Sequence, residues 1–198
     1  MNAYISLESY CNREETNYGI GVSVSLDEEV LKKELVRKKN VLSNNNWLKV
    51  EIPDEKYFLD TNKLIKDQNE TVLEGIKNEA FLSTVFIYET KKLCRKAEKE
   101  SEEPLTKDDY EGILDGVIKE RYESFVQNIT GLDYFTYLIG KSDYHDKRFA
   151  AAILYKYGIK GCKYSDAMGD HILIFNPKDD IQILDFKSEC LIDSKISM

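Results

Sequence analysis

Histidine and proline are scarce in this sequence, and basic residues are fewer than acidic ones. The 198 residues include only two histidines, His145 and His171, and three prolines. A Ser-His-Asp triad or a histidine-rich metal site therefore has almost no residues to draw on. The 28 basic residues are outnumbered by 36 acidic ones, which gives a net charge of -8. This balance disfavours nucleic acid as a partner, because binding to phosphate backbones depends on Lys and Arg, although it leaves room for a local basic patch.

Long apolar runs and paired cysteines are also absent. No segment reaches the roughly 18 to 20 consecutive apolar residues that span a bilayer, and the opening stretch, MNAYISLESYCNREE, lacks the basic and apolar regions of a secretion signal. Cys11, Cys94, Cys162 and Cys190 form no CxxC pair, so we expect isolated reduced thiols and no metal site. These absences predict a cytoplasmic protein that makes no membrane contact.

The residues that are present predict one domain of the α+β class over 1–198. Apolar residues make up 42% of the chain and aromatic residues 11%, which is enough to build a core. Residues 3–7 and 19–25 have the alternation of strands, and a third strand follows around Trp47. Between the second and third strands, Ser25 and Glu28 have the spacing of a capping box, which predicts a helix that begins at Ser25.

The middle of the chain changes to the helical period. Residues 70–81 and 83–101 predict two helices, and Thr106 with Asp109 predicts the cap of a longer third helix that carries an apolar stripe to Ile129. The charged stretch 98–109 contains Pro104 and is the best candidate for a linker. We therefore expect a helical insertion at about 68–130.

The last third returns to mixed structure. Residues 146–158 predict an Ala-rich helix that buries Phe149 and ends at Gly158. Three short strands follow, GCKYS, HILIF and IQIL. The turn-forming stretch 176–179 between the last two predicts a closing β-hairpin.

Two blocks in this closing segment resemble a known family. Their residues are Gly158, Ile159, Gly161, Tyr164 and Asp166 in the first block, and Phe175, Asn176, Ile181 and Ile183 in the second. The pattern looks like that of the ADP-ribosyltransferase-like domains in large polyvalent phage proteins and in short phage anti-CRISPR ADP-ribosyltransferases. The stretches GIGVSVSLDEEV and LKVEIPDEKYFLDTNKLIKDQ are similar to earlier segments of that family, in the same order, whereas 81–127 has no counterpart.

The resemblance implies a split β-sheet that binds NAD and transfers its ADP-ribose to a host protein. It implies Asp166 as the catalytic carboxylate, because a fixed carboxylate can stabilise the positive charge that develops on the ribose. No metal is required. The residues implied as contacts of the cofactor are Tyr4, Ser6, Gly19, Gly21, Ser23, Ser25 and Tyr164.

Two departures from the family pattern leave a second hypothesis open. The family has His or Arg in the first strand where this chain has Ile5, and often an aromatic residue where it has Val24. A catalytically inactive member of the fold, which binds a host protein by docking, would account for both. A nucleic-acid mimic is a third hypothesis, and it depends only on the net charge of -8.

Several of the candidate residues also have an ordinary structural explanation. Asp166 can form an Asx turn with its own backbone, Ser25 can act only as a helix cap, and Gly19 with Gly21 can serve a tight turn. His171 is expected at the surface or at a strand edge. Residues 32–39, KKELVRKK, are the only concentrated basic stretch that we identify, and we expect a solvated helix face there.

The acidic and basic residues at 143–148, DYHDKR, have a structural explanation as well. They stand where a helix is expected to begin, so Asp143 or Asp146 is expected to cap it.

Overall fold

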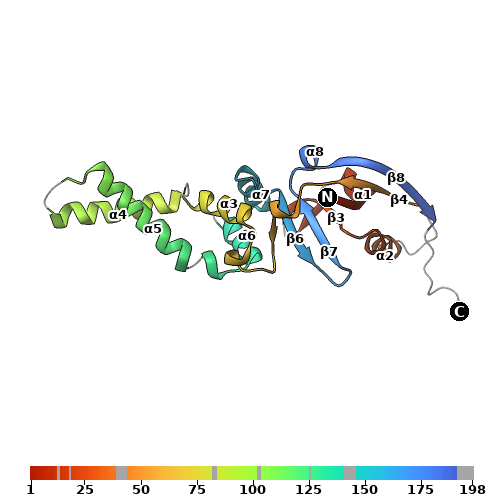
Figure 1. Ribbon diagram of the computed structural model, residues 1–198, viewed down its shortest axis with the longest axis horizontal. Helices are drawn as coiled ribbons and strands as arrows, with labels where there is room; N and C mark the ends of the chain where they lie inside the picture. Colours follow the sequence, from red (N-terminus) through yellow and green to blue (C-terminus); the bar gives the residue numbers. More distant parts are fainter. Residues whose placement is uncertain are drawn as a thin grey trace.

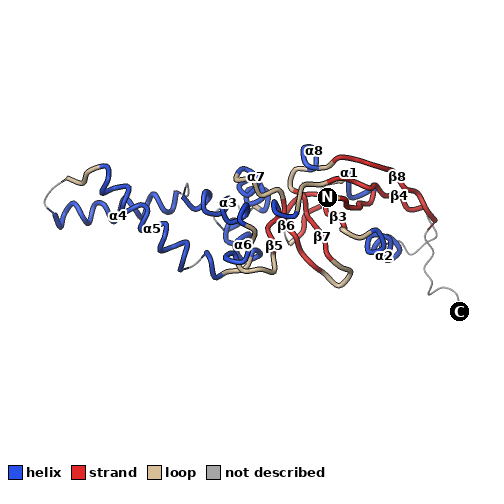
Figure 2. The backbone as a smooth tube through the Cα atoms, viewed as in Figure 1, coloured by secondary structure: helices blue, strands red, loops and turns tan. Residues whose placement is uncertain are grey.

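The computed structural model describes residues 1–12, 14–17, 19–38, 44–81, 84–101, 104–124, 126–140 and 146–190. The molecule is elongated, with a β-sheet at one end and a helical arm at the other (Figure 1, Figure 2). None of the described helices has both the length and the apolar character needed to cross a membrane.

One mixed sheet organises the first end of the molecule. It runs in the order β5-β6-β7-β3-β1-β4-β8, with β2 paired to β3 outside this path. Only β5 and β6 are parallel, and the other pairs are antiparallel. The strands are β1 (Asn2–Ser6), β2 (Glu14–Thr16), β3 (Gly19–Ser25), β4 (Asn44–Glu51), β5 (Phe58–Asp60), β6 (Gly161–Ser165), β7 (Asp170–Ile174) and β8 (Gln182–Cys190).

Eight described helices accompany this sheet, and some of them form the arm (Figure 1). They are α1 (Leu7–Cys11), α2 (Glu28–Lys38), α3 (Glu70–Phe81), α4 (Thr84–Ser101), α5 (Lys107–Ser124), α6 (Gly131–Gly140), α7 (Lys147–Lys156) and α8 (Pro177–Asp180). Three short 3-10 turns lie at Glu55–Tyr57, Ile65–Asp67 and Val126–Asn128. This combination of a mixed sheet and helices confirms the α+β class.

The sheet has two faces because side chains alternate along each strand. One face is an apolar core that includes Ala3, Ile5, Val22, Val24, Leu48, Val50, Ile172 and Ile174. On the other face, α2 places Leu31 and Leu35 against Trp47, and all three are buried. Burying a leucine of this kind stabilises a fold by roughly 1.5 to 3 kcal/mol, so α2 has a fixed position on this second face.

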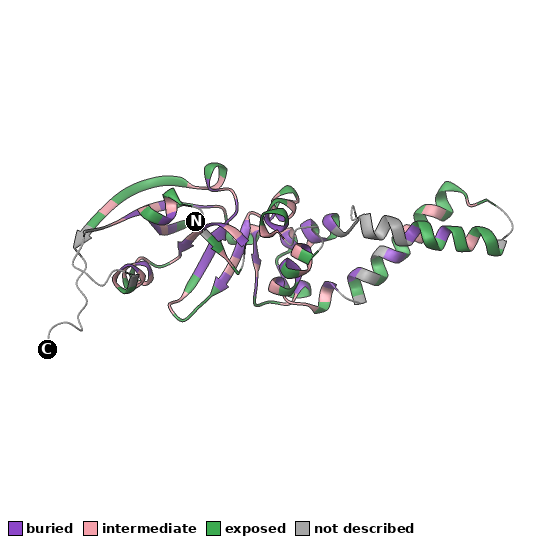
Figure 3. Ribbon diagram, turned by 180° about the vertical axis from the view of Figure 1, so that it is seen from behind, coloured by how far each residue is buried: buried purple, intermediate pink, exposed green. Residues whose placement is uncertain are grey.

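The arm divides into an inner and an outer part. α3, α6 and α7 contribute to a core that also takes in side chains of the sheet, such as Cys162 and Leu173. α4 and α5 extend beyond it and pack on each other, and many of their described residues are exposed (Figure 3). Among their described residues, one separate apolar cluster consists of Val117 with the half-buried Ile113 and Leu114 of α5.

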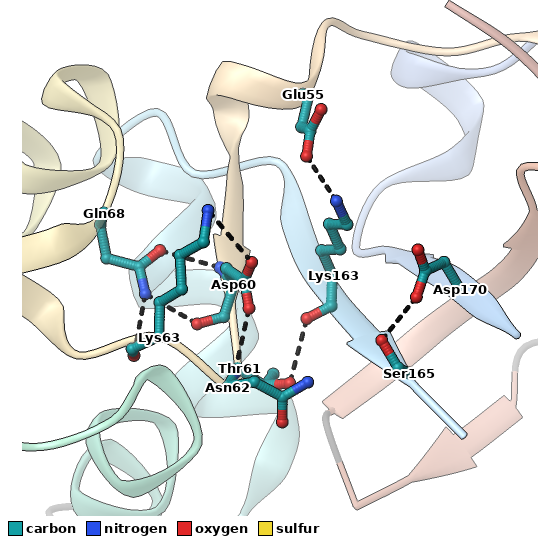
Figure 4. A network of polar contacts seen from close by, with 9 residues as sticks. All are labelled: Glu55, Asp60, Thr61, Asn62, Lys63, Gln68, Lys163, Ser165 and Asp170. Atoms are coloured by element: carbon teal, nitrogen blue, oxygen red, sulfur yellow. Dashed lines mark hydrogen bonds and ion pairs between the residues drawn. The ribbon is translucent and has the colours of Figure 1, made fainter. Parts of the chain in front are cut away.

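A buried glutamine fixes the start of the arm to the sheet. Gln68 accepts a hydrogen bond from the Asp60 amide at 2.9 Å and donates to the carbonyl oxygens of Asp60 at 2.7 Å and Lys63 at 3.2 Å (Figure 4). Next to it, the Thr61 hydroxyl donates to the Lys163 carbonyl at 3.0 Å. The chain that leaves β5 is therefore held beside β6 before α3 begins.

The predicted closing hairpin is wrong. β7 pairs with β3 and β6, whereas β8 pairs with β4 at the opposite edge of the sheet. The stretch between them forms the short helix α8, with Pro177 in its first turn, a position that proline favours. The period of a strand predicts which face it buries, but it does not identify the neighbouring strands.

Three further expectations about the helices are wrong in part. α4 continues to Ser101, so the first residues of the proposed linker 98–109 are helical. The third helix ends at Ser124, and α6, which has no counterpart in the predictions, follows a short turn. Phe149, expected in the core, is 42% exposed. Asp146 does cap α7, since its carboxylate accepts from the Arg148 amide at 2.8 Å, whereas Asp143 lies outside the described residues.

Candidate functional site

A polar pocket of about 200 Å³ lies on the second face of the sheet, beside α2 and the β6–β7 hairpin. We call it the serine pocket, because Ser6, Ser9, Ser23 and Ser25 all line it. Five of the eight residues predicted for the site are among its lining residues, namely Ser6, Ser23, Ser25, Tyr164 and Asp166. Strand pairing brings them together, since β1 and β7 are both neighbours of β3.

Tyr4, Gly19 and Gly21 are not brought into the pocket. Tyr4 packs against the cluster beneath α2. Gly19 has φ +131°, a backbone conformation that residues with a side chain rarely adopt. A Cβ atom at Gly21 would come 2.2 Å from the Ile174 carbonyl oxygen, so this glycine allows close pairing of β3 with β7. Both glycines therefore have structural explanations, but Gly21 lies within β3 and not in the tight turn that we expected for it.

Asp166 forms the turn of the β6–β7 hairpin. Its Oδ1 accepts hydrogen bonds from the amides of Met168 at 2.7 Å and Gly169 at 3.3 Å. The hairpin is also held by the Ser165 hydroxyl, which donates to Asp170 at 2.6 Å (Figure 4). The Asx-turn explanation of Asp166 is thus confirmed, and the turn is what places this carboxylate at the pocket.

The surroundings of Asp166 keep it ionised. Partial burial on its own raises the pKa of this carboxyl group, but the Met168 amide, the His171 imidazole and the Gly169 amide outweigh it and hold the pKa below the ordinary value. The side chain is still 48% exposed. At neutral pH the pocket therefore contains a negative charge that solvent or a ligand can reach.

His171 lies at the floor of the site and not at the surface. Its side chain is only 3% exposed, because β7 lies between β3 and β6 and is not an edge strand. Its Nε2 atom is 3.2 Å from Oδ1 of Asp166 and 3.5 Å from Oε1 of Glu34. The imidazole stacks on Tyr164, with ring centroids 5.4 Å apart and an interplanar angle of 25°. The expectation of a strand-edge histidine is wrong.

The serine hydroxyls bind one another and their neighbours. The Ser23 hydroxyl and the Tyr164 hydroxyl are 2.6 Å apart, and either can donate. The Ser6 hydroxyl donates to the Ser9 hydroxyl at 2.8 Å and accepts from the Ser9 amide at 3.0 Å, which caps α1. The lining of the pocket therefore contains two pre-formed hydrogen-bonded pairs, Ser6 with Ser9 and Ser23 with Tyr164.

Ser25 does not cap α2. Its hydroxyl donates to the Asp27 carbonyl at 3.0 Å, while the Asp27 carboxylate accepts from the Glu29 amide at 2.8 Å. The helix begins at Glu28, because Ser25 is still the last residue of β3 and is paired with His171. Asp27 is the capping residue, and Ser25 is a buried residue of the pocket wall.

Two charged residues of α2 complete the pocket, and sequence patterns do not single them out. Glu34 and Arg37 are three residues apart, which places them on one side of a helix, and both line the pocket. Arg37 belongs to the stretch expected as a solvated face. Its guanidinium is exposed and has no ion-pair partner within the described part of the chain. The period of α2 does not reveal which part of the sheet the helix covers.

Glu34, Asp166 and His171 are also a candidate set of metal ligands. One donor atom from each lies within 4.8 Å of the others, and separations of 3.2 and 3.5 Å suit ligands that share a cation at roughly 2.0 to 2.2 Å. The same distances suit an imidazolium held between two carboxylates.

Comparison with known protein families, with curated proteins and with solved structures found no match. At the level of class, the chain is an α+β protein with a polar pocket that combines a buried imidazole, two carboxylates and four serines.

Proposed function

We propose that the serine pocket binds the nicotinamide ribose end of NAD, and that the protein transfers ADP-ribose to a host protein, as in an ADP-ribosyltransferase-like fold. One observation carries the proposal. The residues implied by the resemblance come from β1, β3 and the β6–β7 hairpin, and five of the eight line one pocket. Residues as far apart in the chain as Ser6 and Asp166 share it.

The charges of the pocket suit the chemistry. When the bond to nicotinamide breaks, the leaving group takes the bonding electrons and positive charge develops on the ribose ring. Asp166 is held ionised, and Glu34 lies near it beside His171, so two acidic groups can stabilise that charge. A nucleophile of the acceptor protein then bonds to the same carbon, and Glu34 is positioned to take the proton it loses.

The size of the pocket limits what enters it. A volume of about 200 Å³ is below the roughly 300 to 1,000 Å³ of sites that enclose a whole ligand. Only one end of the dinucleotide can be enclosed, so the diphosphate must lie along the rim. Arg37 lines that pocket and is exposed, and a guanidinium binds phosphate oxygens well.

Release of nicotinamide from NAD, measured with wild type in a host lysate, tests the proposal. Asp166→Asn is the informative variant, because its amide oxygen can still accept the hydrogen bonds of the turn while the charge is gone. We expect at least a tenfold loss of release. Asp170→Asn removes a carboxylate from the same hairpin that does not line the pocket, and it should retain the activity. Equal release by wild type and Asp166→Asn would contradict the proposal.

A second candidate is the same fold without catalysis, acting by docking on a host protein. The observation that favours it concerns Ile5, which stands where the family has His or Arg. Ile5 is fully buried in the core on the other face of the sheet, so β1 supplies no basic side chain to the pocket. A protein of this kind would bind its target without any affinity for NAD.

A further inference from the structure

The outer arm carries a concentrated patch of positive charge. The expectation that residues 32–39 are the only such stretch is wrong, because α4 forms a second one. A groove of about 400 Å³ on this helix, which we call the basic groove, is lined by Lys91, Lys92, Arg95, Lys96 and Lys99.

Helical spacing gathers these cations on one side of α4. Lys91 and Lys92 are followed one turn later by Arg95 and Lys96, and after another turn by Lys99, so neighbouring levels are about 6 Å apart. Thr90 and Cys94 lie on the other side of the helix and are buried. The basic groove therefore runs along the solvent side of the arm.

Among the described residues of the arm, few ion pairs neutralise this charge. Lys96 forms an ion pair with Glu100 at 3.8 Å, and both side chains are largely exposed. The other four cations form no ion pair with any residue that the structure describes. Like charges one turn apart repel each other in a helix, so an anionic partner would remove a repulsion that the fold leaves in place.

We propose that the basic groove binds the phosphate backbone of double-stranded nucleic acid. Every described residue that lines it is cationic, which is typical of nucleic-acid interfaces. Interfaces with proteins have an apolar, aromatic-rich centre that is depleted of charge, and a helix that inserts into a membrane surface uses an apolar face. The described residues of the groove include no apolar or aromatic side chain.

Among the residues that the structure describes, the groove has no aromatic side chain on which unpaired bases could stack. Its contacts would therefore be to phosphates, and such contacts do not depend on sequence. The net charge of -8 belongs to the whole chain, whereas α4 lies at the end of the molecule away from most of the sheet (Figure 1). α4 itself has five basic and three acidic residues. α5, which packs on α4, has three basic and six acidic residues, so the local excess of positive charge is confined to α4. This inference does not depend on NAD binding in the serine pocket.

Fluorescence anisotropy with a labelled 20-base-pair DNA duplex of random sequence, added to the full chain, tests the inference. We expect saturable binding at 25 mM salt that weakens steeply as salt rises. Three to five phosphate contacts predict a slope of about -2.7 to -4.5 in a plot of log affinity against log salt.

A triple variant, Lys92→Glu with Arg95→Glu and Lys96→Glu, should weaken binding at least tenfold. The matched control is Lys56→Glu with Lys66→Glu and Lys178→Glu, which changes the net charge by the same amount at exposed positions outside the groove. The control should bind within about twofold to threefold of wild type. Circular dichroism checks that both variants remain folded.

Four results would overturn the inference. They are no binding of the duplex at 25 mM salt, an equal loss of affinity in the groove variant and the control, tighter binding of a single strand of the same length, and equal affinity for a polyglutamate peptide. The last result would identify an acidic protein segment as the partner.

Discussion

Nε2 of His171 lies 3.2 Å from Oδ1 of Asp166, and this contact joins the exposed turn of the β6–β7 hairpin to the buried floor of the serine pocket. The same oxygen also accepts from two backbone amides of the turn. A substitution at Asp166 therefore changes both the shape of the hairpin and the charge beside the imidazole, and the two effects need separate variants.

Asp166→Ala is expected to lower the free energy of unfolding by about 1 to 2 kcal/mol, because it removes the acceptor for the turn amides and for His171. Asp166→Asn should lower it by less, since an amide oxygen can still accept from Met168 and Gly169. Urea denaturation of the three proteins measures the difference. Equal losses for Ala and Asn would show that the turn bonds contribute little.

The stabilising effect of the Asp166 charge should depend on pH. Its pKa is lower in the folded protein than the roughly 3.9 of an unfolded chain, so the ionised form favours folding. The contribution is present above pH 4 and is lost as pH falls through the lower folded value. The difference in unfolding free energy between wild type and Asp166→Asn should therefore shrink between pH 5 and pH 2. A difference that grows over this range would contradict the account.

Gly21→Ala should destabilise the sheet, since the new Cβ atom would meet the Ile174 carbonyl oxygen at 2.2 Å. We expect a loss of at least about 2 kcal/mol, comparable with overpacking in a core. Gly112→Ala is the matched control, because nothing lies within 4 Å of its Cβ position in α5. There the same substitution should stabilise the helix by roughly 0.5 to 1 kcal/mol. Thermal unfolding of both variants distinguishes the two sites.

Tyr134→Phe should weaken the packing of α6 on α3. The Tyr134 hydroxyl donates to Oε2 of Glu79 at 2.6 Å, and both side chains are buried. Burial, followed by the charge of Glu79 and this hydrogen bond, raises the pKa of Tyr134 well above its ordinary value, so it remains a donor up to high pH. Losing the donor should cost about 1 to 3 kcal/mol of unfolding free energy, measured by chemical denaturation. A cost below about 0.5 kcal/mol would contradict this.

Local patterns predicted the elements of the fold better than their arrangement. The strand at Gly19–Ser25 and the helix at Glu70–Phe81 lie where the sequence predicts them, because period and flanking turns are local signals. The pairing of β8 with β4 joins segments that are far apart in the sequence, so local patterns do not predict it. Phe149 shows the same limit. The apolar side of α7 is buried at Ala150, Ala151 and Leu154, whereas Phe149 is exposed to solvent.

The candidate site divides in the same way. Asp166 and Tyr164 belong to one motif, and the structure places both at the serine pocket. Glu34 and Arg37 come from a helix whose sequence is typical of a solvated surface, and only the packing of α2 over the sheet brings them there. His171 looks like an edge residue because Asp170 and His171 open an apolar strand, and its burial follows from the strands on either side.

Calorimetric titration of NAD into the wild-type protein tests the central claim most directly. Trp47, the single tryptophan, is buried beneath α2 beside the pocket and gives an independent fluorescence signal. The account predicts saturable one-to-one binding that Arg37→Ala weakens at least fivefold and Lys178→Ala leaves unchanged. No heat and no change in fluorescence at millimolar NAD would contradict the claim that the serine pocket binds this cofactor.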